Sequence, residues 1–240
     1  IIVLPSSKNA HNGSFYSSSV PTGNFENFIA GELNDSIDGH CRTLAKPESR
    51  GLVGHSMGGY GASRIGIRRA ERYGALYLMA PCCQSASNTR GLTAEQVAQL
   101  EALASPEAAG SLPFGLRGTL ALASAWSPNP AKPPLFIDLP VDSAGKERPD
   151  ILAKWAANAP LAFLDQYVSK VRISRAIAMD VGDKDSLVSE TRRMHEALLA
   201  QGIANTFEIY PGDHTSHVAF RIQQNVLPFF GRNLSFSKGR

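Results

Sequence analysis

The sequence has few cysteines and no long hydrophobic run. Only three of its 240 residues are cysteine, namely Cys41, Cys82 and Cys83, and an odd number of thiols excludes a complete disulfide framework. None of them has a histidine at the spacing of metal ligands, so we predict neither a metal nor another cofactor. Cys82 and Cys83 follow an apolar run, where packing as small apolar side chains is favoured over redox chemistry. No apolar stretch approaches the roughly 20 residues that span a bilayer, which predicts a soluble protein.

Neither positive nor negative charge is in large excess. The formal net charge is +3 with 19% charged residues, and the basic residues are scattered, so nothing indicates a nucleic-acid partner. Arg64, Arg68 and Arg72 repeat every four residues and share one predicted helix face, which we interpret as solvated. The opening Ile1-Ile2-Val3-Leu4-Pro5 has neither an initiator Met nor a signal-peptide core, which suggests a processed or shortened chain. The compartment, cytoplasmic or secreted, and the oligomeric state, including a homodimer, stay open.

Strand and helix patterns alternate along the chain. Continuous apolar runs predict buried strands, and apolar residues at helical spacing predict helices. The predicted strands cover residues 1–4, 51–54, 75–80, 173–181 and 203–210, and the predicted helices cover residues 25–37, 57–72 and 187–201. Such alternation favours a mainly parallel sheet with helices on both faces, in a single α/β domain over residues 1–240.

The interval over residues 84–170 interrupts this alternation. Prolines break it into short pieces, with helices still predicted over 93–103 and 160–168. A connection of this length in a compact sheet is usually functional, so we predict a cap inserted over the site. Its aromatic residues either line an apolar pocket or pack beneath the cap. They are Phe114, Trp126 and Phe136.

The segment Gly54-His55-Ser56-Met57-Gly58 matches the pattern G-x-S-x-G. It follows a predicted strand and opens a predicted helix, the context in which a sharp turn lifts a serine hydroxyl above the sheet edge and glycines avoid clashes. A structural glycine-serine turn is the alternative. Ser56 is therefore the candidate nucleophile, and the backbone N–H of Met57 is a candidate oxyanion-hole donor.

A serine hydroxyl becomes an effective nucleophile only beside a base that a carboxylate orients. Asp185 and His214 each follow a predicted strand, in the chain order serine, acid, histidine. Asp183 is an alternative acid that more readily explains a turn, and Asp180 on the strand itself is a weaker one. His217, about one helical turn beyond His214, is the alternative base.

Four segments together resemble the putative-esterase (esterase D-like) family of α/β-hydrolases. They are Ser14-Phe15-Tyr16, residues 54–62, Gly182-Asp183-Lys184-Asp185 and Tyr210-Pro211-Gly212-Asp213-His214. The resemblance implies an α/β-hydrolase fold with Ser56, Asp185 and His214 as the catalytic triad. The family's amino-terminal strands and its His-Gly segment have no counterpart here, so the second oxyanion donor is open, and the loop over residues 6–24 is one substitute.

These observations predict a serine carboxylesterase that hydrolyses short-chain acyl or aryl-acid esters through an acyl-enzyme intermediate. The expected partner is a small-molecule ester. Phe15, Tyr16 and His55 are candidate substrate-binding residues, with packing as the alternative for each and, for His55, a hydrogen-bonded position inside the fold. An acyltransferase of the same fold and a non-catalytic hydrolase-like module are the alternative functions.

Overall fold

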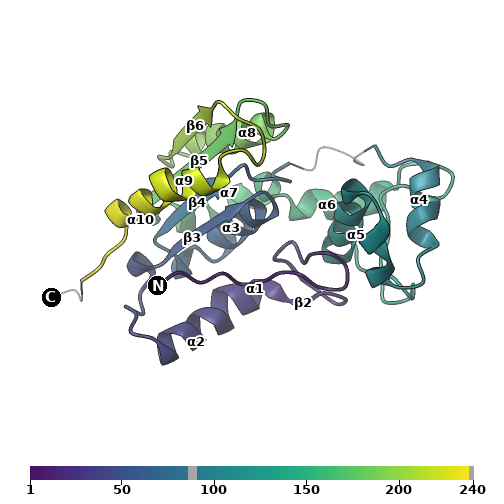
Figure 1. Cartoon of the computed structure of the whole chain (residues 1–240), viewed down its shortest axis with the longest axis horizontal. Coiled ribbons are helices and arrows are strands. Elements are labelled where there is room, and N and C mark those ends of the chain that lie inside the picture. The colour runs from purple at the N-terminus through teal and green to yellow at the C-terminus, as the bar shows by residue number, and fades with distance from the viewer. Residues whose placement is uncertain (86–90, 238–240) are drawn as a thin grey trace. The chain divides into compact units, whose positions relative to one another are not determined.

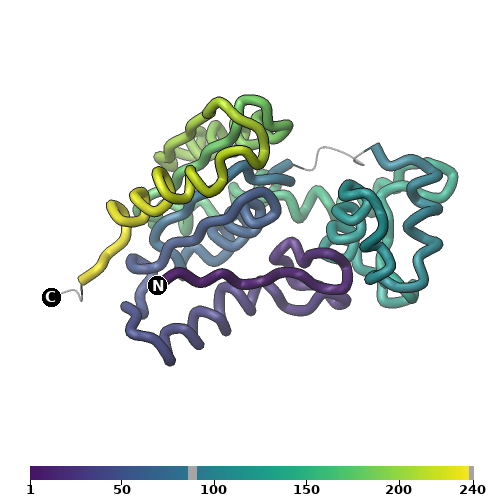
Figure 2. Tube along the Cα trace, viewed as in Figure 1, coloured from purple at the N-terminus to yellow at the C-terminus, as the bar shows by residue number. Residues whose placement is uncertain are grey.

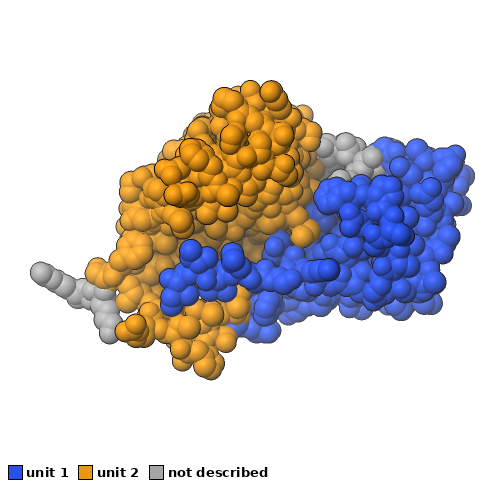
Figure 3. Space-filling model, in the orientation of Figure 1, with its two compact units in different colours: residues 1–32, 86–158 blue, residues 33–85, 159–240 orange. Residues whose placement is uncertain are grey.

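The computed structural model describes residues 1–85 and 91–237. These residues form two compact units, coloured separately in Figure 3. Unit 1 comprises residues 1–32 and 86–158, and unit 2 comprises residues 33–85 and 159–240. The predicted insertion over residues 84–170 thus contributes to both units, and its role as a cap stays a prediction.

Unit 2 is built on a four-stranded parallel sheet with strand order β3-β4-β5-β6 (Figure 1). Its strands are β3 (Gly51–His55), β4 (Ala75–Met79), β5 (Ala176–Gly182) and β6 (Thr206–Tyr210). Because every neighbouring pair is parallel, the carboxyl ends of all four strands meet at one edge, where such sheets bind ligands. The predicted mainly parallel sheet is confirmed, with four of the five predicted strands in place.

Helices cover both faces of this sheet. The helices of unit 2 are α2 (Leu33–His40), η2 (Pro47–Ser49), α3 (Met57–Arg68), η3 (Ala70–Arg72), α7 (Pro160–Val171), α8 (Val188–Ala200), α9 (Val218–Arg221), η5 (Ile222–Val226) and α10 (Leu227–Asn233). On one face, Leu76 of β4 lies against Gly66 of α3. On the other face, Tyr77 meets Phe229 of α10 edge to face, with ring centroids 5.3 Å apart. Since alternate strand residues point to opposite faces, these two contacts confirm the two-sided cover.

Arg64 and Arg68 of α3 pack against other side chains, so the prediction of a solvated face is wrong for these two, whereas Arg72 lies on η3 and is half-buried. Arg64 is only 6% exposed and hydrogen-bonds to the hydroxyl of Tyr60 over 3.2 Å. The guanidinium of Arg68 lies over the rings of Phe163 and Tyr167 on α7, at 5.8 and 6.0 Å from their centroids. Aromatic rings attract guanidinium groups by cation–π interaction, so charged periodicity alone does not identify a solvent face.

Unit 1 is mainly helical. Its elements are the antiparallel pair β1 (Ser18–Ser19) and β2 (Gly23–Asn24), then α1 (Phe25–Asn27), η1 (Phe28–Glu32), α4 (Ala94–Glu101), η4 (Pro106–Ser111), α5 (Phe114–Trp126) and α6 (Pro149–Asn158). An aromatic cluster forms part of its core. The ring centroid of Trp126 lies 5.6 Å from that of Phe15 and 5.8 Å from that of Trp155. Trp126 therefore packs in the interior, whereas Phe114 is 79% exposed.

Residues 1–4 form no strand, contrary to the sequence prediction. They run as an extended trace outside any sheet (Figure 2), and Ile1 and Leu4 are 78% and 90% exposed. A β-branched apolar run favours an extended backbone, but a strand also needs hydrogen-bonded neighbours. Within the described ranges, no helix combines the length and the apolar character needed to cross a bilayer.

Candidate active site

Ser56 occupies a strained turn between β3 and α3. Its backbone has φ 57° and ψ −115°, a conformation that side-chain-bearing residues rarely adopt. The Ser56 N–H donates to the carbonyl oxygen of Met79 on β4 over 3.0 Å, which fixes the turn to the sheet. A Cβ atom at Gly54 would overlap the carbonyl group of Gly58, so this bend requires glycine at position 54. The predicted sharp turn at Ser56 is thus present, and backbone strain of this kind is common at functional sites.

Three side chains converge at the carboxyl edge of the sheet. The Oγ atom of Ser56 lies 2.8 Å from Nε2 of His214, and Nδ1 of the same ring lies 2.6 Å from Oδ2 of Asp185. The side chain of Asp185 is 1% exposed, and that of His214 is 36% exposed. The other carboxylate oxygen of Asp185 accepts the Leu187 N–H over 2.9 Å. A carboxylate held on both oxygens can orient the imidazole, and the imidazole can take a proton from the hydroxyl.

The loops that carry the acid and the histidine are joined backbone to backbone. A Cβ atom at Gly182 would overlap the carbonyl oxygen of Gly212, which also accepts the Lys184 N–H over 2.9 Å. Oδ1 of Asp183 accepts the Gly212 N–H over 2.8 Å. Asp183 therefore shapes the turn, as its sequence position suggests, and sets the spacing between the two loops.

The two other candidate histidines are His217 and His55. In the described part of the chain, neither forms a hydrogen bond with Ser56 Oγ. His217 is exposed and packs its ring on Tyr210, with centroids 6.0 Å apart. His55 lies at the end of β3, where its Nε2 is 2.8 Å from the carbonyl oxygen of His214 and the two rings are 4.6 Å apart. Burial lowers the pKa of His55, although the hydrogen bond to His214 opposes that effect. His55 thus supports the backbone of His214.

Asp180, the third carboxylate considered, belongs to a separate buried cluster. Its Oδ2 accepts hydrogen bonds from Nε of Arg221 over 2.8 Å and from the Tyr77 hydroxyl over 2.9 Å. Arg221 also forms a paired contact with both carboxylate oxygens of Glu208, at 2.8 and 2.6 Å. Burial raises the pKa of Asp180 against the opposing influence of Arg221. The cluster attaches α9, which follows the His214 loop, to the sheet.

The other predicted site residues fall in two places. Met57 is the first residue of α3, and the first N–H groups of a helix have no acceptor within it and lie at its positive end. Phe15 and Tyr16 lie in unit 1 with φ 47° and 48°, and Phe15 is buried against Trp126. A contact between these two residues and a substrate stays a prediction.

One supporting residue could not have been found from the sequence. Glu190 on α8 accepts the Gln84 N–H over 3.2 Å and the Ser85 hydroxyl over 2.9 Å. These contacts hold the segment that follows β4, beside the serine turn. Nothing in the local pattern around Glu190 marks it, because its partners are more than 100 positions away in the chain.

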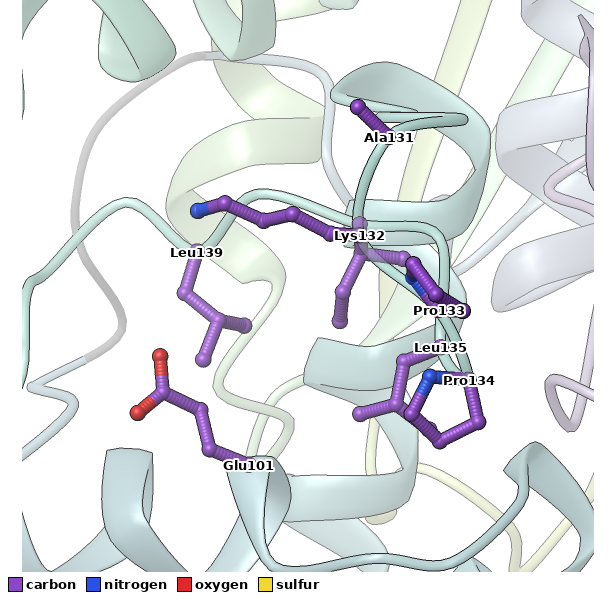
Figure 4. A pocket seen from close by; sticks show the side chains of 8 residues that line it. Glu101, Ala131, Lys132, Pro133, Pro134, Leu135 and Leu139 are labelled. Atoms are coloured by element: carbon purple, nitrogen blue, oxygen red, sulfur yellow. The ribbon is translucent and has the colours of Figure 1, made fainter.

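A cavity in unit 1 has no counterpart among the predicted site residues. Its volume is about 360 Å³, and Figure 4 shows the side chains that line it. It is lined by Glu101, Ala131, Lys132, Pro133, Pro134, Leu135, Ile137 and Leu139. The ammonium of Lys132 is paired with Asp138 over 2.7 Å, and the side chain of Glu101 adds a carboxylate to the otherwise largely aliphatic lining. In the described part of the chain, no group of histidine, cysteine or carboxylate side chains could hold a metal.

The chain resembles known esterases in sequence pattern and fold. The model of the family described as "Putative esterase" matches residues 5–223. A ferulic acid esterase superposes with a TM-score of 0.60 at 17% identity, over 91% of this chain and 64% of that protein. The fluorophosphonate-binding serine hydrolase F of Staphylococcus aureus gives 0.58 at 16% identity, over 90% and 67%.

An S-formylglutathione hydrolase of Agrobacterium tumefaciens gives a TM-score of 0.50 at 18% identity, over 93% of this chain and 64% of that protein. The chain thus spans about two thirds of the length of these structures. Among curated proteins, none matches the sequence. The structural similarities establish that the fold is the α/β-hydrolase fold.

Proposed function

The chain belongs to the family described as "Putative esterase", and on that premise we propose that it is a serine carboxylesterase acting through an acyl-enzyme. One observation carries the proposal: a single imidazole, that of His214, lies 2.8 Å from the hydroxyl of Ser56 and 2.6 Å from the carboxylate of Asp185. This arrangement supplies a nucleophile, a base and an orienting acid in one chain of hydrogen bonds.

Acylation begins when Ser56 Oγ attacks the ester carbonyl carbon and His214 Nε2 takes its proton. Asp185, which accepts the Nδ1 proton, keeps the imidazole in the tautomer that leaves Nε2 able to accept. The charge that develops on the carbonyl oxygen faces the start of α3, where the Met57 N–H is one donor. Collapse of the tetrahedral intermediate expels the alcohol, to which His214 returns the proton.

Deacylation repeats these steps with water as the nucleophile. His214 removes a proton from the water, which attacks the acyl carbon, and Ser56 leaves as the protonated hydroxyl. Short-chain acyl and aryl-acid esters are the proposed substrates. A ferulic acid esterase shares the fold, which supports including an aryl-acid ester among those tested.

The test is hydrolysis of a chromogenic series of acetate, butyrate and octanoate esters, together with a hydroxycinnamate ester, by wild type and Ser56→Ala. We expect the substitution to lower kcat at least about 10³-fold and to abolish labelling by a fluorophosphonate probe. Ser63→Ala is the matched control, because Ser63 lies on α3 and hydrogen-bonds to the Tyr60 carbonyl over 2.9 Å. Equal hydrolysis by wild type and Ser56→Ala would refute the proposal.

The same assay separates the two alternative functions. An acyltransferase would release the chromogenic alcohol but pass the acyl group to an added alcohol, so product analysis would find a new ester instead of the free acid. A non-catalytic module would neither hydrolyse the esters nor react with the fluorophosphonate at Ser56.

A further inference from the structure

Two adjacent thiols lie in the loop that follows β4, beside the serine turn. The Sγ atoms of Cys82 and Cys83 are 2.9 Å apart, within about 1 Å of the length of an S–S bond, about 2.05 Å. Both residues are partly exposed. The third cysteine, Cys41, is exposed and lies just after α2.

The backbone around the pair is held in an unusual shape. Cys83 has φ 61°, a left-handed conformation that a side-chain-bearing residue rarely adopts without support. That support is visible on both sides. The Cys82 N–H donates to the Ser56 carbonyl over 3.2 Å, and Gln84 Nε2 donates to the Cys82 carbonyl over 2.8 Å. These contacts hold the backbone of the pair in a conformation in which the two Sγ atoms lie 2.9 Å apart.

A bond between neighbouring cysteines is expected to be labile. Consecutive Cα atoms lie about 3.8 Å apart across a trans peptide, less than the roughly 4.4–6.8 Å that disulfides usually span. Strained, accessible disulfides are easily reduced, and these are typically the regulatory ones. The position of this pair favours reversible exchange over permanent cross-linking.

We propose that Cys82 and Cys83 form a reversible vicinal disulfide by exchange with a low-molecular-weight disulfide such as oxidised glutathione. The thiolate of one cysteine attacks a sulfur of the reagent, forming a mixed disulfide and expelling one thiolate, which takes up the proton that the cysteine lost. The thiolate of the other cysteine then attacks the protein-bound sulfur, closes the ring and expels the second thiol. The protein loses two hydrogen atoms, and one disulfide is reduced to two thiols.

The experiment uses the full chain with Cys41→Ser, which leaves only the two adjacent thiols. The protein is equilibrated with reduced and oxidised glutathione at a series of ratios, the reaction is quenched with acid, and intact mass and thiol content are measured. We expect the protein to lose two hydrogens and both titratable thiols without gaining glutathione. Cys41→Ser with Cys83→Ser should instead retain one bound glutathione. A stable glutathione adduct on Cys41→Ser, with no ring form at any ratio, would overturn the proposal.

A second measurement tests whether the folded backbone favours the bond between Cys82 and Cys83. The same titration in concentrated urea removes the backbone support, while the two cysteines stay adjacent in sequence. At one fixed concentration of reduced glutathione, we expect half-oxidation of the native protein at a ratio of oxidised to reduced glutathione about tenfold lower than in urea. An equal or higher ratio for the native protein would contradict preorganisation. Because mass and thiol content are the readouts, this result is independent of the proposed esterase activity.

Discussion

The imidazole of His55 donates a hydrogen bond from Nε2 to the backbone carbonyl oxygen of His214, over 2.8 Å. Since a carbonyl oxygen can only accept, the proton resides on Nε2 of His55. The residue before the candidate nucleophile therefore supports the backbone of the candidate base. The contact joins the end of β3 to the loop after β6, two strands that are not neighbours in the sheet.

His55→Phe tests this support. Phenylalanine keeps a planar ring but cannot donate to the His214 carbonyl, so we expect kcat to fall about tenfold with little change in KM. His55→Gln retains an amide donor and is expected to recover most of the rate. Steady-state kinetics on a chromogenic ester provides the measurement. Equal loss in the two variants would show that ring packing, and not the hydrogen bond, is what matters.

The half-buried position of His55 predicts that the free energy of unfolding depends on pH. Burial lowers the pKa of His55 in the folded state, whereas an unfolded chain titrates near its ordinary value of about 6.5. Between the folded pKa and about 6.5 the unfolded state binds more protons, so the free energy of unfolding falls as pH drops through this window. The difference in unfolding free energy between wild type and His55→Phe should therefore shrink from pH 8 to pH 5.5, as followed by urea denaturation. A constant difference would contradict the prediction.

Asp185→Asn tests the proposed role of Asp185 as the acid that orients His214. An amide can donate to Nδ1 of His214 and so stabilise the wrong tautomer, for which we expect a fall in kcat on the order of 10³- to 10⁴-fold. Asp183→Asn is the matched control, because its side-chain oxygen can still accept the Gly212 N–H. Its kcat should stay within about tenfold of wild type. If Asp183→Asn were the more damaging change, the assignment of the acid would be wrong.

Gly182→Ala should separate the two loops that carry the acid and the histidine. The added Cβ would overlap the Gly212 carbonyl, and we expect a loss of about 1–3 kcal/mol in unfolding free energy together with lower kcat. Gly39→Ala on α2 is the control, since nothing lies within 4 Å of a Cβ there. It should leave kcat unchanged and stabilise the helix by up to about 1 kcal/mol. Urea denaturation and ester hydrolysis measure both effects.

Arg221→Met should leave Asp180 buried without its cation. Both side chains are almost inaccessible, at 6% and 1% exposed, so we expect a loss of about 3–5 kcal/mol in unfolding free energy. Arg69→Met removes an ion pair to Glu71 whose side chains are 33% and 48% exposed. This control should change stability by less than about 0.5 kcal/mol. Similar losses of unfolding free energy in the two variants would contradict the prediction that the buried ion pair of Arg221 and Asp180 stabilises the protein more than the exposed one.

Local sequence patterns were sufficient to predict most of the sheet in unit 2. The apolar run at β4 and the alternation of strands with helices predicted a mainly parallel sheet, because a strand buried on both faces needs apolar side chains throughout. The glycines around Ser56 predicted the sharp turn, since residues with a Cβ cannot approach as Gly54 and Gly58 do. Helix boundaries were less accurate, and the helix predicted to reach Arg72 ends at Arg68.

What the sequence determined by itself is which chemical groups follow which strands, and in what order. Only the tertiary structure decided that His214 contacts Ser56 and Asp185, that His55 supports the backbone of His214, and that the arginines of α3 stack on α7. The physical reason is that sequence patterns report the preferences of neighbouring residues, whereas these contacts join segments up to 159 positions apart. The same limit explains residues 1–4, whose apolar, β-branched run favours a strand but which are paired with no strand in the structure.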